Sequence, residues 1–174
     1  MRLRGYQPSD LEPLLALFTA SVHGLGGARY DRAQLAAWAP PAPDRAGWRE
    51  RLEQAHTLVA EIDGQPAGFL SCRLDGHIEQ LFVAPGHARR GVATRLYAQA
   101  EAMLVAAGIR ELTTEASLVA RPFFERHGFI VHEAQRAERQ GVVLRRYAMR
   151  KEISAAARPA ARQPGHGKDA IGGK

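Results

Sequence analysis

Apolar side chains recur along the first 55 residues at the spacing of amphipathic helices. The longest such set follows a capping-box pattern at Ser9-Asp10-Leu11-Glu12 and consists of Leu11, Leu14, Leu15, Phe18 and Val22. We therefore predict a helix that starts at this box and ends at the glycines after it. Two shorter helices are expected to begin directly after Asp31 and Asp44, because aspartate is a favoured N-cap residue.

The pattern then changes to short apolar runs separated by turn residues. Residues 57–62, 67–74 and 77–83 are predicted to be strands. The pairs Asp63-Gly64 and Asp75-Gly76 stand between them, and Asp-Gly is a strong hairpin signal. Three consecutive antiparallel strands are expected.

Helical spacing returns over residues 92–107, which Gly108 is expected to close. A short strand at 111–116, a helix at 121–127 and a hairpin of residues 129–138 and 142–151 follow. A helix that connects two strands of one sheet makes them parallel. The pattern therefore predicts a single α/β domain over residues 1–153, built on a mixed sheet.

Residues 154–174 differ from the rest of the 174-residue chain. They are rich in Ala, Gly and Pro, with Ile171 as their one large aliphatic side chain. Such a segment cannot bury a core, so we expect a disordered basic tail. The tail carries half of the net charge of +6, and no nucleic-acid-binding motif is visible. A nucleic-acid-binding module is therefore the weakest functional interpretation.

Other features of the sequence indicate a cytoplasmic enzyme or binding protein. Cys72 is the single cysteine, which excludes an internal disulfide and fits a reducing compartment. The chain has neither a signal-peptide pattern nor a 20-residue apolar run, so no membrane partner is expected. The seven histidines lack the spacing of metal ligands, and no metal is expected.

Residues 81–94, LFVAPGHARRGVAT, carry the most specific chemistry of the chain. A strand runs through a Pro/Gly loop and two arginines into a Gly-x-Ala step that opens a long helix. The first turn of a helix has unpaired N–H groups and a positive dipole end. Gly91 and Ala93 leave room for phosphate oxygens, while Arg89 and Arg90 add positive charge. A plain strand-to-helix connection would give the same local pattern.

This segment resembles the pyrophosphate-binding motif of the GNAT family of N-acetyltransferases, Gln/Arg-x-x-Gly-x-Gly/Ala. Gly91 and Ala93 match its small positions, and Ala88 stands where the family has Gln or Arg. The preceding strand matches the Leu-x-Val-x-Pro pattern with Leu81, Val83 and Pro85.

A second GNAT-like element lies at residues 117–129. It is similar to the pattern Asn-x-x-Ala…Phe-Tyr-x-x-x-Gly-Phe, with Ser117 in place of Asn and Phe124 in place of Tyr. The resemblance covers about residues 1–152. It implies a mostly antiparallel single sheet with helices on both faces, and a homodimer through the last strands is a family-level expectation.

The resemblance also implies acetyl-CoA as co-substrate. Its pantetheine arm would lie against the edge of strand 77–83, where the next strand diverges. The Leu81 N–H would donate to the thioester oxygen. The cofactor contacts implied in this way are Leu81, Phe82, Val83, Ala88, Arg89, Arg90, Gly91, Val92, Ala93, Thr94, Ser117 and Phe124.

Two side chains on the same strand are candidates for a general base, because an ammonium must lose a proton before it attacks a thioester. Strand alternation predicts that His77, Glu79, Leu81 and Val83 share one face. Glu79 is the first candidate, directly or through a water, and His77 is the second. Alternatively, Glu79 pairs with an arginine at the surface and His77 only borders the Asp75-Gly76 turn.

The remaining positions leave alternatives open. Phe124 cannot protonate the leaving thiolate, so water, Ser117 or Tyr147 would have to do so. Ser117 is equally a helix cap. Tyr30 and Trp38 are candidates for the acceptor pocket, although a hydrophobic staple between Tyr30 and Leu35 also accounts for Tyr30.

These expectations combine into one functional hypothesis. The chain is predicted to move the acetyl group of acetyl-CoA to a primary amine of a small molecule or peptide, by direct attack in a ternary complex. The alternative is a catalytically weak or inactive acetyl-CoA-binding sensor or accessory domain, which Phe124 and Ala88 keep open.

Overall fold

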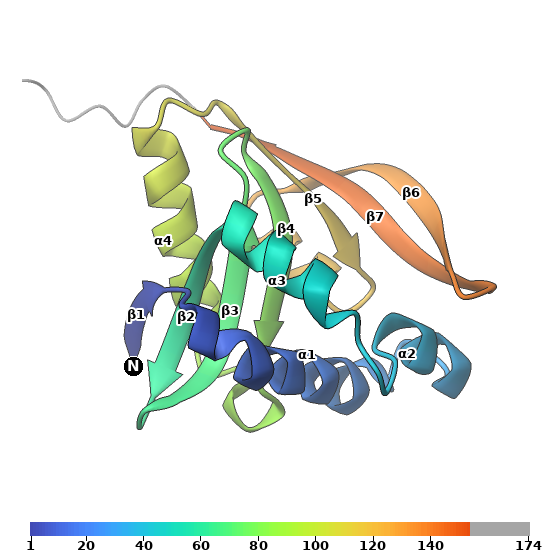
Figure 1. Cartoon of the computed structure of the whole chain (residues 1–174). Coiled ribbons are helices and arrows are strands. Elements are labelled where there is room, and N and C mark those ends of the chain that lie inside the picture. Colours follow the sequence, from blue (N-terminus) through green and yellow to red (C-terminus); the bar gives the residue numbers. More distant parts are fainter. Residues whose placement is uncertain (154–174) are drawn as a thin grey trace, which may run out of the picture.

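A seven-stranded mixed sheet forms the middle of the protein in the computed structural model, which describes residues 1–153 (Figure 1). In spatial order its strands are β1 (Arg2–Gly5), β2 (His56–Ile62), β3 (Gln65–Cys72), β4 (His77–Val83), β5 (Glu111–Ser117), β7 (Val142–Glu152) and β6 (Ile130–Arg139). Among these seven strands of the described residues, only β4 and β5 pair in parallel. The predicted single, mostly antiparallel sheet is confirmed, whereas the predicted tail, residues 154–174, lies outside the described residues.

Helices cover both faces of this sheet. On one face lie α1 (Leu11–Gly26), α2 (Arg32–Trp38) and α3 (Arg45–Gln54), and on the other lie α4 (Val92–Ala106) and α5 (Arg121–Arg126). Short 3-10 turns, η1 (Pro8–Asp10) and η2 (Pro85–His87), precede α1 and α4. Each helical layer has its own apolar core, one around Leu96 and Tyr97, the other around Phe18 and Phe69. Within the described residues no helix is long and apolar enough to cross a membrane.

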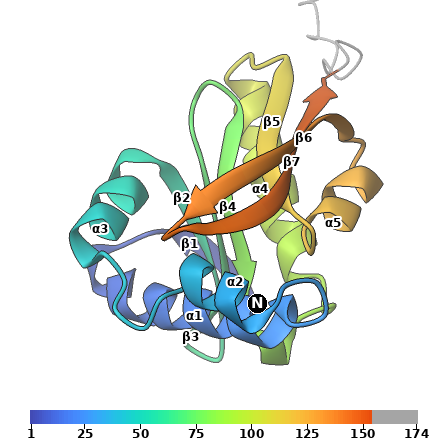
Figure 2. The same cartoon turned by 90° about the vertical axis from the view of Figure 1, so that its right-hand side faces the viewer.

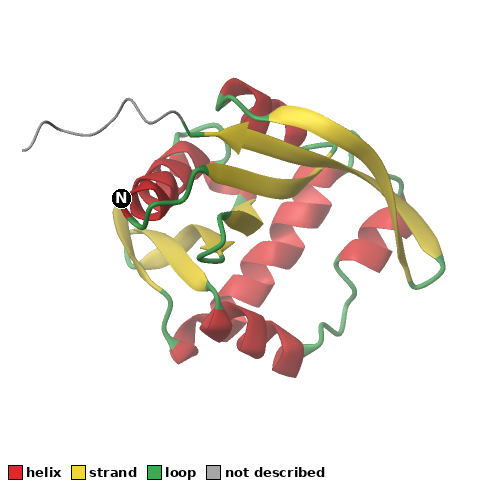
Figure 3. Ribbon diagram, turned by 90° about the horizontal axis from the view of Figure 1, so that it is seen from above, coloured by secondary structure: helices red, strands yellow, loops and turns green. Residues whose placement is uncertain are grey.

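The last two strands form a long curved hairpin that pairs with β5 only through β7 (Figure 3). Gln140 and Gly141 make its turn, both with positive φ. Seen face on, the hairpin passes in front of the sheet, with α3 and α5 to either side and α2 below it (Figure 2). The hairpin therefore forms a wall opposite α3.

The predicted caps of the two short helices are confirmed. The Asp31 carboxylate accepts from the Gln34 N–H at 2.8 Å, and the Asp44 carboxylate accepts from the Gly47 N–H at 3.0 Å. Local side-chain chemistry is therefore sufficient to start both helices.

The predicted cap of α1 is wrong. Ser9 is exposed within η1, and the Gln7 N–H donates instead to Asp10 Oδ2 at 2.8 Å. Arg4 holds the same carboxylate with two hydrogen bonds, of 2.7 and 2.9 Å. These bonds from Arg4 lower the pKa of the Asp10 carboxyl below its ordinary value. A contact with β1, outside the helix, therefore sets where α1 begins.

Strand β4 contains a β-bulge at Glu79. Gln80 lies opposite Ser71, but the next pair of β3 and β4 joins Cys72 to Ile78, so Glu79 has no partner residue. An extra residue of this kind reverses the in-out alternation of the strand on either side of it.

The bulge contradicts the expectation that His77, Glu79, Leu81 and Val83 share one face. Ile78 packs with Leu81 and Val83 in the core beneath α4. His77 and Glu79 line a cavity on the opposite side of the sheet, the side of α3. The sequence analysis assumed that side chains alternate strictly between the two faces of the strand, and this alternation does not continue through an inserted residue.

Candidate functional site

The sheet opens between its two parallel strands. β4 and β5 pair at His77–Thr113 and Ile78–Thr114 only. There the Thr114 hydroxyl donates to the Ile78 carbonyl at 2.9 Å. Beyond this point, no strand of the described residues pairs with the edge of β4 that faces β5. The family resemblance implies such an opening.

Backbone amides of β4 point into this opening. The Ala84 N–H donates to the Ala67 carbonyl of β3. Because successive amides of a strand point to opposite edges, the N–H groups of Leu81 and Val83 face away from β3. An extended ligand can therefore pair with this edge as an added strand would.

Two cavities adjoin at the opening. The smaller, of about 140 Å³, lies beside Val83 and Ala93 and is lined almost wholly by apolar side chains. The larger, of about 680 Å³, extends between α3, the β6–β7 hairpin and β4. The residues that line both are Trp38, Leu81, Phe82, Ser117 and Ala120. A narrow arm and a separate small molecule can thus meet at Leu81.

The first turn of α4 lies at the outer end of the narrow cavity, where Ala93 is part of its lining. Gly91 has φ +80°, and a Cβ on it would meet no atom within 4 Å. No side chain caps this 15-residue helix, so the N–H groups of its first turn are open to a ligand. Arg89 and Arg90 are exposed beside them. The turn has the form of an anion-binding site.

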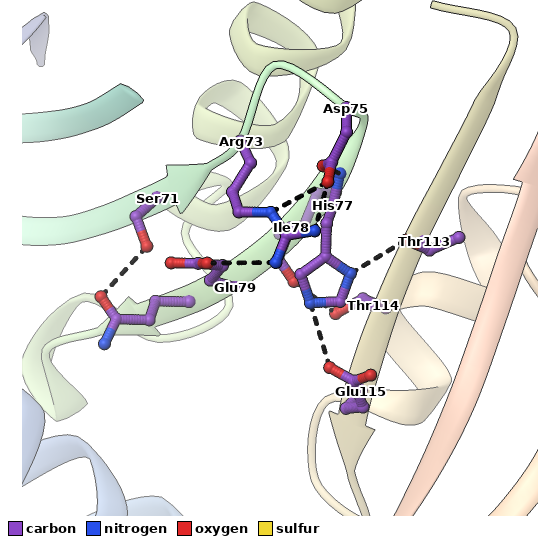
Figure 4. Close-up of polar contacts among 10 residues, drawn as sticks. Ser71, Arg73, Asp75, His77, Ile78, Glu79, Thr113, Thr114 and Glu115 are labelled. Atoms are coloured by element: carbon purple, nitrogen blue, oxygen red, sulfur yellow. Dashed lines mark hydrogen bonds and ion pairs between the residues drawn. The ribbon is translucent and has the colours of Figure 1, made fainter. Parts of the chain in front are cut away.

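His77 is held firmly by β5 (Figure 4). Its Nε2 lies 3.0 Å from Glu115 Oε2, and its Nδ1 lies 2.9 Å from Thr113 Oγ1. A carboxylate only accepts, so the neutral ring donates from Nε2 to Glu115 and accepts at Nδ1 from the Thr113 hydroxyl. His77 therefore has a defined tautomer and orientation, and does more than border the turn.

Glu79 is held more loosely. Its carboxylate lies 3.8 Å from Arg73 Nη1, while Arg73 also binds the Asp75 carboxylate at the turn (Figure 4). The pairing with an arginine considered from the sequence thus exists, but it is a long one. Glu79 remains free to bind a ligand in the large cavity, which it lines.

Tyr30 and Trp38 both line the large cavity. The Tyr30 hydroxyl donates to the Arg145 carbonyl and accepts from the Leu118 N–H, each at 2.9 Å. Burial raises the pKa of this phenol. Trp38 packs edge-on against the Tyr30 ring and also reaches the narrow cavity. Tyr30 thus links β7 to the loop after β5, and Trp38 lies where the two cavities meet.

The candidates for thiolate protonation lie around α5. Ser117 Oγ accepts from the Ala120 N–H at 3.1 Å, so it caps the turn before α5, and it also lines both cavities. Phe124 is buried among aromatic rings and lines the large cavity without offering a proton. The Arg121 guanidinium covers the Tyr147 ring at 4.4 Å.

Sequence reasoning missed the arginines of the large cavity: Arg51 on α3, and Arg139, Arg145 and Arg146 on the hairpin. In the sequence they are indistinguishable from solvated surface charges. The curvature of the hairpin brings Arg139, Arg145 and Arg146 to the cavity wall that Arg51 of α3 also lines, and no local pattern encodes that curvature. In contrast, no three His, Cys, Asp or Glu side chains among residues 1–153 gather to hold a metal ion.

The acyl-CoA N-acyltransferase fold is a mixed sheet that opens between two parallel strands, here β4 and β5, and the first of these strands leads into a helix with a glycine at its N-cap, here α4. Residues 28–152 match the family model described as "Acetyltransferase (GNAT) domain". The chain therefore belongs to the GNAT family of acetyltransferases.

Individual relatives agree with this assignment. The uncharacterized N-acetyltransferase YafP of Escherichia coli (strain K12) is 38% identical over 150 residues, which cover 86% of this chain and 95% of YafP. The crystal structure of a GCN5-related N-acetyltransferase from Rhodopseudomonas palustris matches with a TM-score of 0.84 and 34% identity, over 87% of this chain and 95% of that one. The PaiA N-acetyltransferase of Thermoplasma acidophilum, solved in complex with coenzyme A, shares the fold with a TM-score of 0.72 at 17% identity, over 87% and 98% of the two chains.

Proposed function

We propose that the protein transfers the acetyl group of acetyl-CoA to a primary amine of a small molecule or peptide, within a ternary complex. The observation that carries this proposal is the meeting of two cavities at Leu81, beside the opening between β4 and β5. Direct transfer needs both substrates at one point, and this geometry provides it.

The cofactor side of the proposal uses the narrow cavity and the start of α4. The pantetheine arm pairs with Leu81, Phe82 and Val83 along the free edge of β4. The pyrophosphate lies at the open helix turn, contacted by Ala88, Arg89, Arg90, Gly91, Val92, Ala93 and Thr94. The fold likeness to PaiA, which was solved with coenzyme A, supports this placement.

The reaction joins the amine nitrogen to the acetyl carbon and releases the thiolate of coenzyme A. The Leu81 N–H donates to the acetyl oxygen as negative charge develops there, and one such donor typically contributes about 3 kcal/mol. We assign the role of general base to Glu79, which would remove the proton of the ammonium directly or through a water, and His77 is the second candidate. Because Phe124 has no hydroxyl, we assign protonation of the thiolate to water.

The acceptor amine occupies the large cavity in this proposal. Tyr30 and Trp38 form part of its wall, and the carboxylates of Glu79 and Glu115 lie along its β4–β5 side. Two carboxylates favour a cationic ammonium over neutral molecules of the same shape.

Amine-dependent release of coenzyme A tests the proposal. Purified protein is mixed with acetyl-CoA and a panel of primary amines, free thiol is measured, and the acetylated product is identified by mass. Thiol release that depends on an amine is expected. Binding of acetyl-CoA without such release would instead support an acetyl-CoA-binding sensor. This is the second candidate function, and it is favoured by Phe124, which has no hydroxyl to protonate the leaving thiolate.

A further inference from the structure

The large cavity has a strongly cationic wall opposite β4 and β5. Arg51 comes from α3, while Arg139 and Arg146 come from the β6–β7 hairpin, and all three line the cavity. Figure 2 shows these two elements side by side in front of the sheet. Asp44 lines the same cavity, but its carboxylate is engaged as the N-cap of α3. The cavity is thus positive on one side and negative, at Glu79 and Glu115, on the other.

These guanidinium groups have no anionic partner in the described part of the chain, where every ion pair involves other residues. Arg51 binds the Gly47 carbonyl at 3.2 Å and lies over the Trp48 ring, and Arg146 donates to Gln135 at 3.0 Å. The Arg139 guanidinium makes no hydrogen bond to residues 1–153, and only the backbone of this residue pairs, with Val142. Although the residue as a whole is exposed, partial desolvation of its guanidinium, together with the nearby charges of Arg51 and Arg146, lowers the pKa of Arg139. Like charges gathered without counter-charge repel one another, and an anionic ligand group would relieve this repulsion.

We propose that the acceptor amine also carries a carboxylate, which Arg51, Arg139 and Arg146 bind while the amine lies beside Glu79 and Glu115. Guanidinium groups bind carboxylates through paired, charge-assisted hydrogen bonds. A cavity of about 680 Å³ has the size of a small-molecule site. The opposed charges orient a zwitterionic acceptor with its amine toward Leu81. This inference rests on the proposed acetyl transfer.

Matched acceptor pairs test the inference. The panel consists of ω-amino acids from glycine to 6-aminohexanoate, together with phenylalanine, each compared with its own primary amide. The amide keeps the size and the amine but loses the negative charge. We measure kcat/KM for acetylation and, independently of turnover, the Kd by calorimetry on protein saturated with coenzyme A. At least one carboxylate is expected to exceed its amide tenfold or more in both measurements.

Substitutions assign the preference to the cationic wall. R51Q and R139Q are each expected to reduce the carboxylate-to-amide ratio to threefold or less. Arg136 is the matched control, because it is an exposed arginine on the same strand as Arg139 but, unlike Arg139, does not line the cavity. R136Q is expected to leave the ratio unchanged. Circular dichroism confirms that each variant is folded.

The outcomes separate this inference from the proposed function. Amine acetylation without a carboxylate preference in any pair overturns the inference alone, and so does a preference that survives R51Q and R139Q. The inference is also overturned if neither member of any pair binds. Selective binding of the carboxylates without any release of thiol would support the proposed anion site and refute the proposed acetyl transfer.

Discussion

His77 and Glu79 are two residues apart on β4, yet their surroundings differ. His77 is fixed between Thr113 and Glu115, whereas Glu79 sits on a bulge with one long ion pair. A base must reach the proton it removes, and a loosely held carboxylate at a cavity wall can do so. The distinction between the two candidates is therefore open to a direct kinetic test.

Glu79→Gln keeps the shape of the side chain and removes its basicity. If Glu79 accepts the proton, kcat near pH 7 should fall by roughly 10²–10⁴-fold, the usual contribution of general-base catalysis. The Kd for acetyl-CoA should stay the same, because backbone amides and the start of α4 are expected to hold the cofactor. His77→Gln is the comparison. A hundredfold loss in that variant, with near-full kcat in Glu79→Gln, would reverse the two roles.

Gly91 is the residue at which the proposed pyrophosphate site is most easily blocked. Gly91→Glu adds bulk and negative charge at the open first turn of α4, so the affinity for acetyl-CoA should fall at least tenfold, about 1.4 kcal/mol, by calorimetry. Gly108→Glu is the matched control. Gly108 also has positive φ, +86°, and open space around its Cβ, but it follows the opposite end of the same helix. An equal loss in both variants would contradict the assignment.

At the scale of elements, the start of α1 depends on β1 through the carboxylate of Asp10. This carboxylate satisfies the Gln7 N–H and two nitrogens of Arg4, and its side chain is 8% exposed. Arg4 also binds Glu61 of β2 at 2.9 Å. One partly buried cluster of Arg4, Asp10 and Glu61 thus joins the first helix to the edge of the sheet.

Asp10→Asn should lower the free energy of unfolding by about 2 kcal/mol at pH 7, because it removes the negative charge that pairs with Arg4 and one of the two oxygens that accept from its guanidinium. The pKa of Asp10 is lowered in the folded state, so its contribution is present above the ordinary carboxyl value of about 4 and is lost as pH falls below it. Urea unfolding at pH 7 and pH 3 should therefore show a smaller difference between variant and wild type at pH 3.

Glu12→Gln provides the control for this measurement. Glu12 pairs with Arg45, but the two side chains are 59% and 67% exposed. The loss should stay within about 0.5 kcal/mol at either pH. A loss as large as that of Asp10→Asn would mean that negative charge near the start of α1, and not the partly buried cluster, stabilises this region.

At the scale of the whole molecule, contacts of Ile153 show that the folded domain extends at least to this residue. Its N–H donates to the Arg110 carbonyl at 2.8 Å, and its side chain packs against the core beneath α4. Ile153 therefore belongs with the folded domain, although it lies beyond the last residue of β7.

A chain that ends at Ile153 should keep its Tm within about a degree and its activity within twofold, since the composition of residues 154–174 predicts no core of their own. A chain that ends at Glu152 should melt a few degrees lower, because it loses one hydrogen bond and one apolar contact. Calorimetric scans of the two chains check this. A loss of several degrees on ending at Ile153 would place part of the domain beyond it.

The sequence by itself determined the order of the elements, the caps at Asp31 and Asp44, and the family. These features depend on neighbours a few positions apart, so periodicity and turn residues reveal them. The Gly-x-Ala step at the start of α4 was visible for the same reason, because a helix start is a local structure.

Tertiary structure decided the rest of the site. The bulge at Glu79 arises from the pairing of β4 with β3, and it moved Leu81 and Glu79 to opposite faces. The partners of His77 come from β5, and the cationic wall comes from α3 and a curved hairpin. The bulge depends on how two neighbouring strands pair, and the contacts of His77 join residues 36 or more positions apart. Only the packed sheet decides both, because local spacing carries no information about strand register or about which distant strand or helix lies alongside.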